Sequence, residues 1–143
     1  MTFPQGYKTG LLQAIEAIDL AKVNQAIEWF KDARAAGRHI FVCGNGGSAA
    51  IASHFACDIV KGASFNRHSR FRIMALTDQL ATLTAYANQL GCRTLALTGR
   101  DGGKLGPKAQ LNIQVSVPHM GRIEDAHMIV CHMIVYYFVD VEK

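Results

Sequence analysis

A glycine-rich turn between a strand and a helix restricts most strongly how this chain can fold. Residues 38–43 are rich in β-branched and aromatic side chains, which is typical of a buried parallel strand, and residues 48–60 favour a helix. Glycines let the backbone approach a ligand, and a helix N-terminus favours an anion. The turn predicts a phosphate site made by Asn45, Gly46, Gly47 and Ser48. The motif is neither a full GxGxxG nor a P-loop, so a purely structural turn is the alternative.

The length and composition indicate one globular domain over residues 1–143. Half of the residues are hydrophobic, which allows a chain of this length to bury about 70% of its unfolded surface. No apolar run reaches the roughly 18 residues of a membrane span, and the N-terminus lacks the pattern of a secretory leader. The four cysteines are widely spaced and predict small buried hydrophobes in a reducing compartment. We therefore expect a cytoplasmic protein with no membrane partner.

The charge of the chain is mildly basic, with a net charge of +4 and a pI near 9.0. Its one local basic cluster consists of Arg67, His68, Arg70 and Arg72. Such a cluster is usually a solvated surface, and it suits an anionic small molecule better than a nucleic acid track. We therefore expect no nucleic acid partner.

The alternation of strand and helix patterns predicts an α/β fold. Apolar residues recur at helical spacing over residues 9–36, within an N-terminal helical segment of residues 1–37. Further strands are predicted at 70–76, 93–98 and 111–117, and further helices at 48–61, 79–89, 105–109 and 121–142. This order predicts a three-layer αβα arrangement around a parallel sheet of about four strands, with long terminal helices. The first helix has more apolar surface than one sheet face needs, so part of it is expected at an oligomer contact.

Three strand ends carry polar or glycine-rich loops, and ligands bind at the carboxyl ends of parallel strands. These loops are residues 45–48, Thr77-Asp78 and residues 98–103. We expect these loops to converge, and together they indicate a ligand site more strongly than any one of them does.

Two helices offer histidine and carboxylate side chains at four-residue spacing. His54 and Asp58 share one face of the second predicted helix, and Glu124 and His132 share one face of the last. A histidine and a carboxylate from each helix can bind one divalent ion, with nitrogen and oxygen ligands that suit zinc. The same side chains can transfer protons between adjacent carbons of a sugar. The alternative is an ordinary surface hydrogen bond within each helix.

Several segments together resemble the sugar isomerase (SIS) domain, and within it the phosphoheptose isomerase branch. The segments are residues 41–48 (FVCGNGGS), 51–58 (IASHFACD), 75–78 (ALTD), 81–88 (ATLTAYAN), 97–105 (LTGRDGGKL) and 122–132 (RIEDAHMIVCH). They occur in the family's order and cover nearly the whole chain. The SIS fold is a flavodoxin-like or Rossmann-like parallel sheet covered by helices.

The resemblance implies a cytoplasmic homotetramer, or a dimer, that interconverts sedoheptulose 7-phosphate and D-glycero-D-manno-heptose 7-phosphate. It places Asn45 and Ser48 at phosphate or substrate contacts and Asp78 at a substrate contact. Its metal and acid–base positions fall on His54, Asp58, Glu124 and His132; Asp58, Glu124 and His132 are the implied catalytic residues. The family usually has Glu in place of Asp58 and Gln in place of Glu124.

The resemblance also implies that an internal segment is missing between Asn88 and Gln89. At that point the family has a helix, a strand, a serine-rich phosphate loop and a further helix. A crossover through residues 79–89 still permits a four-stranded sheet, but the site loses its main phosphate clamp. We expect a phosphosugar isomerase, or a shortened variant with impaired activity. The alternative is a non-catalytic SIS module for sugar-phosphate binding or protein assembly.

A dinucleotide site at the glycine turn is a weaker interpretation. The acidic residue expected about 20 residues beyond such a turn is absent, since Asp78 follows about 30 residues later. We therefore expect no nucleotide cofactor.

Overall fold

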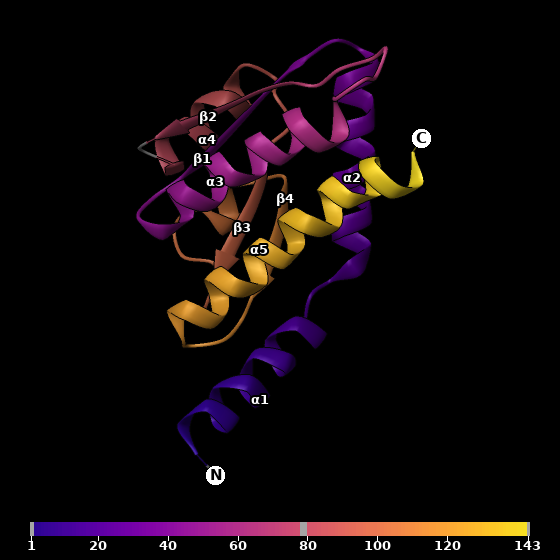
Figure 1. Ribbon diagram of the computed structural model, residues 1–143. Helices are drawn as coiled ribbons and strands as arrows, with labels where there is room; N and C mark the ends of the chain where they lie inside the picture. Colours follow the sequence, from indigo (N-terminus) through magenta and orange to yellow (C-terminus); the bar gives the residue numbers. More distant parts are fainter. Residues whose placement is uncertain (1, 78–79, 143) are drawn as a thin grey trace. The chain divides into compact units, whose positions relative to one another are not determined.

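The computed structural model describes residues 2–77 and 80–142, which form two compact units (Figure 1). One unit combines residues 2–22 with 81–130, and the other combines residues 23–77 and 80 with 131–142. The α-helices of the described residues are α1 (Phe3–Glu16), α2 (Leu20–Ala35), α3 (Gly47–Asp58), α4 (Leu80–Gln89) and α5 (Met120–Tyr136). Short turns of other helix types are η1 (Ile59–Ala63), η2 (Gly106–Lys108) and η3 (Tyr137–Val141). The prediction of a single domain over residues 1–143 stays a prediction.

The four predicted strands are all present and pair in parallel, which confirms the α/β class. β1 (His39–Gly44) pairs with β2 (Arg72–Thr77), and β3 (Leu95–Gly99) pairs with β4 (Leu111–Val115). Among the described residues these pairs form two separate two-stranded sheets in place of one continuous four-stranded sheet. The segment that the resemblance implies to be missing contains a strand, and a sheet that loses an inner strand also loses the hydrogen bonds that join that strand's two neighbours.

The first helical segment is divided, so the prediction of one helix over residues 9–36 was wrong. The break lies between Glu16 and Leu20, where the side chain of Asp19 accepts a hydrogen bond from the backbone N–H of Lys22 over 3.2 Å. Aspartate in this position satisfies an amide that a helix start leaves unpaired. The capping interaction therefore starts a new helix, although the apolar spacing continues through it.

An aromatic cluster forms the centre of the unit that contains β1 and β2. The ring of Phe30 in α2 contacts Phe55 in α3 and Phe71 before β2, at centroid distances of 5.7 and 6.2 Å. Phe71 also packs edge-on against Phe138 at 4.9 Å. Arg34 lies over the Phe71 and Phe138 rings and pairs with the carboxylate of Glu142. These contacts join α2 and α3 to the chain's C-terminal turn.

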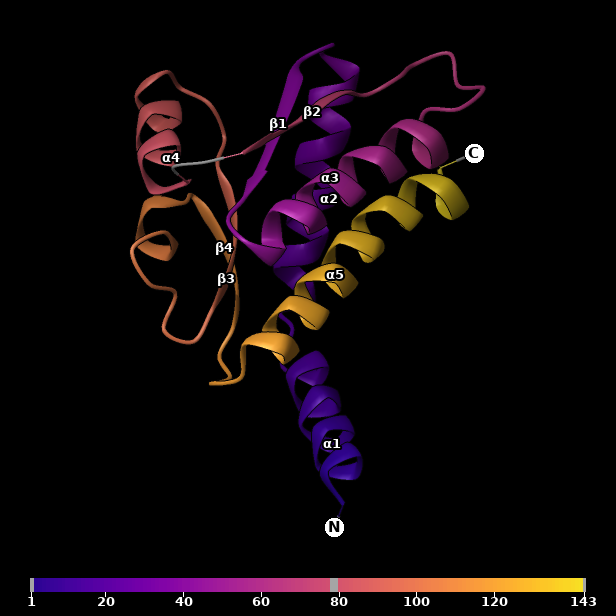
Figure 2. The same cartoon turned by 60° about the vertical axis from the view of Figure 1, so that its left-hand side comes forward.

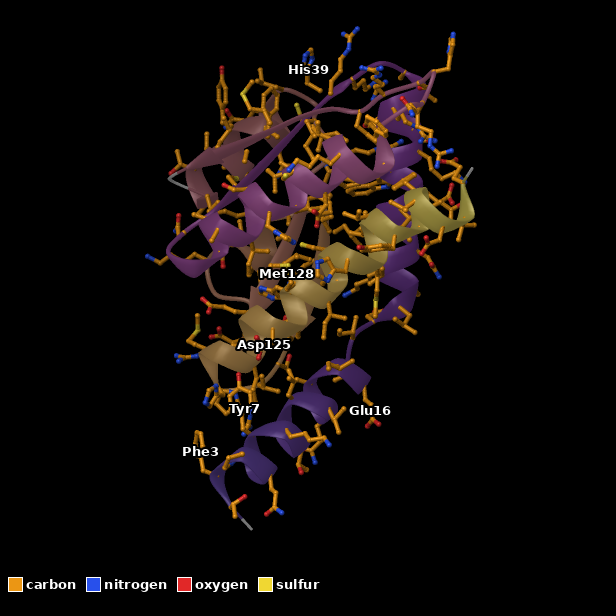
Figure 3. All side chains as sticks on the ribbon, in the orientation of Figure 1. Phe3, Tyr7, Glu16, His39, Asp125 and Met128 are labelled. Carbon is orange, nitrogen blue, oxygen red and sulfur yellow. The ribbon has the colours of Figure 1, made fainter. Side chains whose placement is uncertain are left out.

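The other unit surrounds the β3–β4 pair and attaches α1 to the first turns of α5. The Tyr7 hydroxyl donates a hydrogen bond of 2.7 Å to Asp125, and the Arg122 guanidinium donates to the Gly6 carbonyl. Figure 3 shows Tyr7 and Asp125 pointing toward each other. Leu111, Ile113 and Val115 alternate along β4 as its buried residues. No helix in the described ranges is long and apolar enough to cross a membrane.

The cysteines are less buried than the sequence predicts. Cys131 is buried and Cys43 is half-buried, but Cys57 and Cys92 are exposed. The prediction of buried hydrophobes was therefore wrong for the last two. Cys57 lies on a solvent-facing side of α3, and Cys92 follows the end of α4.

Candidate functional site

The predicted glycine turn connects the end of β1 to the start of α3. Gly46 has a φ of +55°, a conformation that favours glycine, and a side chain on Gly44 would collide with the Ser48 backbone. The Ser48 amide donates to the Asn45 carbonyl over 3.1 Å, and the Ala49 amide donates to the Gly46 carbonyl over 3.0 Å. Asn45, Gly46 and Gly47 are exposed and Ser48 is half-buried. The turn is thus tight and open to solvent, with two helix-start amides already used internally.

His54, Asp58 and His132 lie together, brought from α3 and the C-terminal part of α5. These two helical segments run side by side in both ribbon views (Figures 1 and 2). Asp58 Oδ2 lies 3.1 Å from His54 Nε2 and 3.9 Å from His132 Nε2. The two imidazole rings meet edge-on at 5.7 Å. One ligand atom from each of the three residues lies within 4.8 Å of the others.

The donor set fits a zinc ion. Zinc prefers histidine nitrogen and carboxylate oxygen ligands at about 2.0–2.2 Å, so tetrahedral donors lie about 3.4 Å apart. The two distances from Asp58 Oδ2 lie on either side of that value. His54 is exposed, and Asp58 and His132 are half-buried, so a small ligand can reach the cluster. A tetrahedral zinc site has four ligands, so these three donors leave one position for a further ligand.

Two neighbours of the cluster were not among the predicted site residues. The Tyr136 ring packs edge-on against His132 at 6.1 Å and is itself exposed. Its four-residue spacing from His132 was the available sequence signal. Cys131 lies behind the cluster, where burial and, to a smaller extent, the Asp58 carboxylate raise the pKa of its thiol to about 12. The Cys131 side chain therefore acts as an apolar packing group.

Of the remaining predicted site residues, one belongs to the other compact unit and one lies outside the described residues. Glu124 is on α5 but belongs to the compact unit that contains β3 and β4, so its role in the site stays a prediction. Asp78 lies outside the described residues. The loop after β3 belongs to the same unit as Glu124 and is ordered by its own hydrogen bonds, including one from the Gln114 side chain to the Arg100 carbonyl. The structure thus brings together three of the four predicted metal ligands.

Comparison with known proteins supports the resemblance. The sequence pattern of the SIS domain matches residues 6–98, which is more than half of the chain. The chain belongs to the SIS domain family. A phosphoheptose isomerase of Aliarcobacter butzleri is 30% identical to this SIS protein over 76% of this chain and 77% of that protein. A phosphoheptose isomerase of Geobacter sulfurreducens is 28% identical over 87% of each chain. The relatives place this SIS protein in the phosphoheptose isomerase branch.

Solved structures show the same fold. A phosphoheptose isomerase from Francisella tularensis matches with a TM-score of 0.81 at 19% identity, covering 97% of this chain and 99% of that one. Phosphoheptose isomerase GmhA from Neisseria gonorrhoeae matches with a TM-score of 0.74 at 22% identity, covering 94% and 96%.

The alignments also show that this SIS protein lacks residues present in its relatives. The aligned stretch with the Geobacter sulfurreducens protein is 166 residues long, whereas the whole chain has 143. Some residues of that relative therefore have no counterpart here. This agrees with the predicted loss of an internal segment and with the division of the strands into two sheets.

Proposed function

We propose that this SIS protein is an aldose–ketose isomerase of the phosphoheptose isomerase type. Its substrates would be sedoheptulose 7-phosphate and D-glycero-D-manno-heptose 7-phosphate, and the internal loss makes it a shortened variant with impaired activity. The observation that carries the proposal is the cluster of His54, Asp58 and His132 in a chain of the phosphoheptose isomerase branch. We further propose that the whole chain acts as a single SIS domain in a cytoplasmic homo-oligomer, a tetramer or a dimer.

The reaction needs a base that moves one proton between adjacent carbons of an open-chain sugar. A carboxylate takes the proton from the carbon that bears the hydroxyl and returns it to the former carbonyl carbon. Either Asp58 or Glu124 would serve as this carboxylate. His132, which is half-buried and lies next to Asp58, would transfer the proton between the two oxygen atoms. The phosphate would bind at the turn of residues 45–48, with the Ser48 hydroxyl as a donor and Asp78 at another substrate hydroxyl.

A divalent metal, in our proposal zinc, would be held by His54, Asp58 and His132, with Glu124 as the predicted fourth ligand. Such an ion supplies Lewis-acid polarisation of the substrate's carbonyl and hydroxyl oxygens. His54 is assigned to binding alone, because its hydrogen-bonding distance to Asp58 fixes the carboxylate beside it. Asp58 would thus be both a ligand and a candidate base.

The missing segment would lower the rate by weakening substrate placement. Contacts to a remote phosphate help to hold the reacting carbons in position, so their loss lowers kcat as well as affinity. We expect activity lower by orders of magnitude than that of a full-length relative, with the proton transfer chemistry retained.

Proton exchange is the sharpest test, because it detects the chemistry even when net turnover is slow. The protein is incubated with sedoheptulose 7-phosphate in D₂O, and deuterium at the carbon beside the carbonyl is followed by NMR. We expect exchange by the unaltered protein, loss of exchange and metal in Asp58→Asn, and no change in Cys57→Ala, the exposed neighbour on α3. Glu124→Gln separates the roles: loss of exchange with metal retained would identify Glu124 as the base. If the unaltered protein exchanges no faster than Asp58→Asn does, the protein is not an isomerase, and the non-catalytic SIS module is the remaining interpretation.

A further inference from the structure

The β1–β2 sheet has one face that combines aromatic and cationic side chains. His39 and Phe41 alternate along β1 and so lie on the same face. In the parallel register His39 lies beside Arg72 and Phe41 beside Met74. We call these four residues the ring–arginine face. The two residues of β1 are far in sequence from the two residues of β2, so strand pairing alone creates the patch.

The ring–arginine face is open to solvent and its rings are ordered. Phe41 is 61% exposed and Met74 57% exposed, whereas Ile40 and Ile73 between them are half-buried. The rings of His39 and Phe41 are stacked, with an interplanar angle of 15° and a centroid distance of 6.2 Å. Figure 3 shows His39 at the surface of the protein. Two nearly parallel exposed rings form a platform onto which planar groups can stack.

The chain segment that carries this face is rich in cations. Between Asp32 and Asp78 the sequence contains six lysines and arginines, and its single acidic residue is Asp58. Arg38 precedes β1, and Arg70 and His68 precede β2, all of them exposed. Asp58 faces His54 and His132 in the candidate metal cluster. Two of the six are engaged within the unit, because Arg34 pairs with Glu142 and the Arg67 guanidinium donates to the Phe138 carbonyl. The exposed Arg38, Arg70 and Arg72 are the cations that we assign to an external anion.

We propose that the ring–arginine face binds single-stranded nucleic acid, with bases stacked on Phe41 and His39 and phosphates bound by Arg72 and its neighbouring cations. Stacked rings beside a cationic track are the chemistry that single strands require. Small-molecule sites enclose most of their ligand, and this open face does not. Self-association through this face would bring like charges together, which disfavours a second copy of the chain as its partner. The residues that are adjacent in sequence predict no nucleic acid partner, whereas the strand register places His39, and with it the stacked ring of Phe41, beside Arg72.

Fluorescence anisotropy with a labelled oligothymidylate and a labelled oligouridylate tests the proposal at low salt. We expect both to bind and the matching duplex to bind at least about tenfold more weakly, because its bases are not free to stack. Phe41→Ala should raise Kd about tenfold. Arg72→Ala should weaken binding and reduce the slope of log K against log salt by about 0.7, the value for one single-strand phosphate.

Matched controls lie in the other compact unit. Tyr86→Ala removes an aromatic ring that is 59% exposed, and Lys104→Ala removes an exposed cation; both should leave Kd unchanged. Circular dichroism verifies that each variant is folded. Equal Kd values for the Phe41→Ala and Tyr86→Ala proteins would overturn the proposal, as would duplex binding as tight as single-strand binding. A mononucleotide that competes as well as the oligonucleotide would also overturn it. So would a Phe41→Ala protein that has a smaller particle mass but still binds the oligonucleotide normally.

Discussion

Nε2 of His127 donates a hydrogen bond to the carbonyl oxygen of Thr98, over 3.1 Å, and thereby joins α5 to β3. The imidazole is almost fully buried, with 6% of its surface exposed. Burial lowers the pKa of His127 from its usual 6.5, while the bond to Thr98 and the nearby Glu124 carboxylate oppose this effect more weakly. The neutral form is therefore favoured in the folded protein.

This burial predicts a pH dependence of stability. The pKa of His127 is lower in the folded chain than in the unfolded one, so the unfolded chain takes up the proton first as the pH falls. The free energy of unfolding should have its full value above about pH 6.5. It should fall as the pH drops below that value and should level off below the folded-state pKa. Urea unfolding at about pH 7.5 and about pH 5.5 measures the difference. In His127→Gln the difference should shrink, and in the exposed control His68→Gln it should persist; equal behaviour of the two variants would contradict the assignment.

The metal cluster predicts a selective loss of zinc. Each imidazole is one of the three donors that lie together in the structure, so His54→Ala and His132→Ala should each lower bound zinc from about one ion per chain to near zero. Elemental analysis after dialysis measures the content. His68→Ala, which removes an exposed histidine outside the cluster, should retain the ion. Zinc retained at full occupancy in both cluster variants would show that the ion binds elsewhere.

Phe71 should be a major contributor to stability. Its ring is buried between Phe30 and Phe138, so Phe71→Ala should lower the free energy of unfolding by about 3–5 kcal/mol. The exposed Phe65 provides the matched control, and Phe65→Ala should change the same quantity by less than about 0.5 kcal/mol. Denaturant titrations followed by circular dichroism compare the two. A similar small effect for both would mean that the aromatic cluster is poorly packed in solution.

The bond between Tyr7 and Asp125 should determine how tightly α1 is held. The acceptor carboxylate raises the pKa of Tyr7 above its ordinary value, as expected for a phenol that donates to a negative group. Tyr7→Phe removes the donor and keeps the ring, so amide exchange over residues 3–16 should become faster. Hydrogen exchange with mass spectrometry measures this, with Tyr86→Phe as the control. Unchanged exchange in Tyr7→Phe would show that the Arg122 contacts alone hold α1.

Local patterns predicted the elements whose causes are local. The alternation that buries Leu111, Ile113 and Val115 marked β4 correctly, and the four-residue spacing of His54 and Asp58 anticipated their hydrogen-bonding distance. The break at Asp19 was missed because the apolar spacing continues across it, while the cap that divides the helices depends on one carboxylate.

Features that depend on chain pairing could not be read in the same way. Periodicity does not specify which strands become neighbours, so the division into two sheets was missed. The proximity of His39 to Arg72 likewise required the strand register. The approach of His132 to Asp58 is also non-local, and it was anticipated because both helices carried the same pairing of histidine with a carboxylate. The resemblance added Asp78, and Asp78 lies outside the described residues.

The division of the strands has a practical consequence for handling the protein. Within residues 2–77 and 80–142 each strand has a single neighbour, so all four leave one side of their backbone without a ladder partner. Unpaired strand edges of this kind can form hydrogen bonds with strands of other molecules and so promote aggregation. Concentrated or warmed solutions of the protein should therefore form fibres that bind thioflavin. A lysine substituted in the middle of β1 should delay the appearance of these fibres.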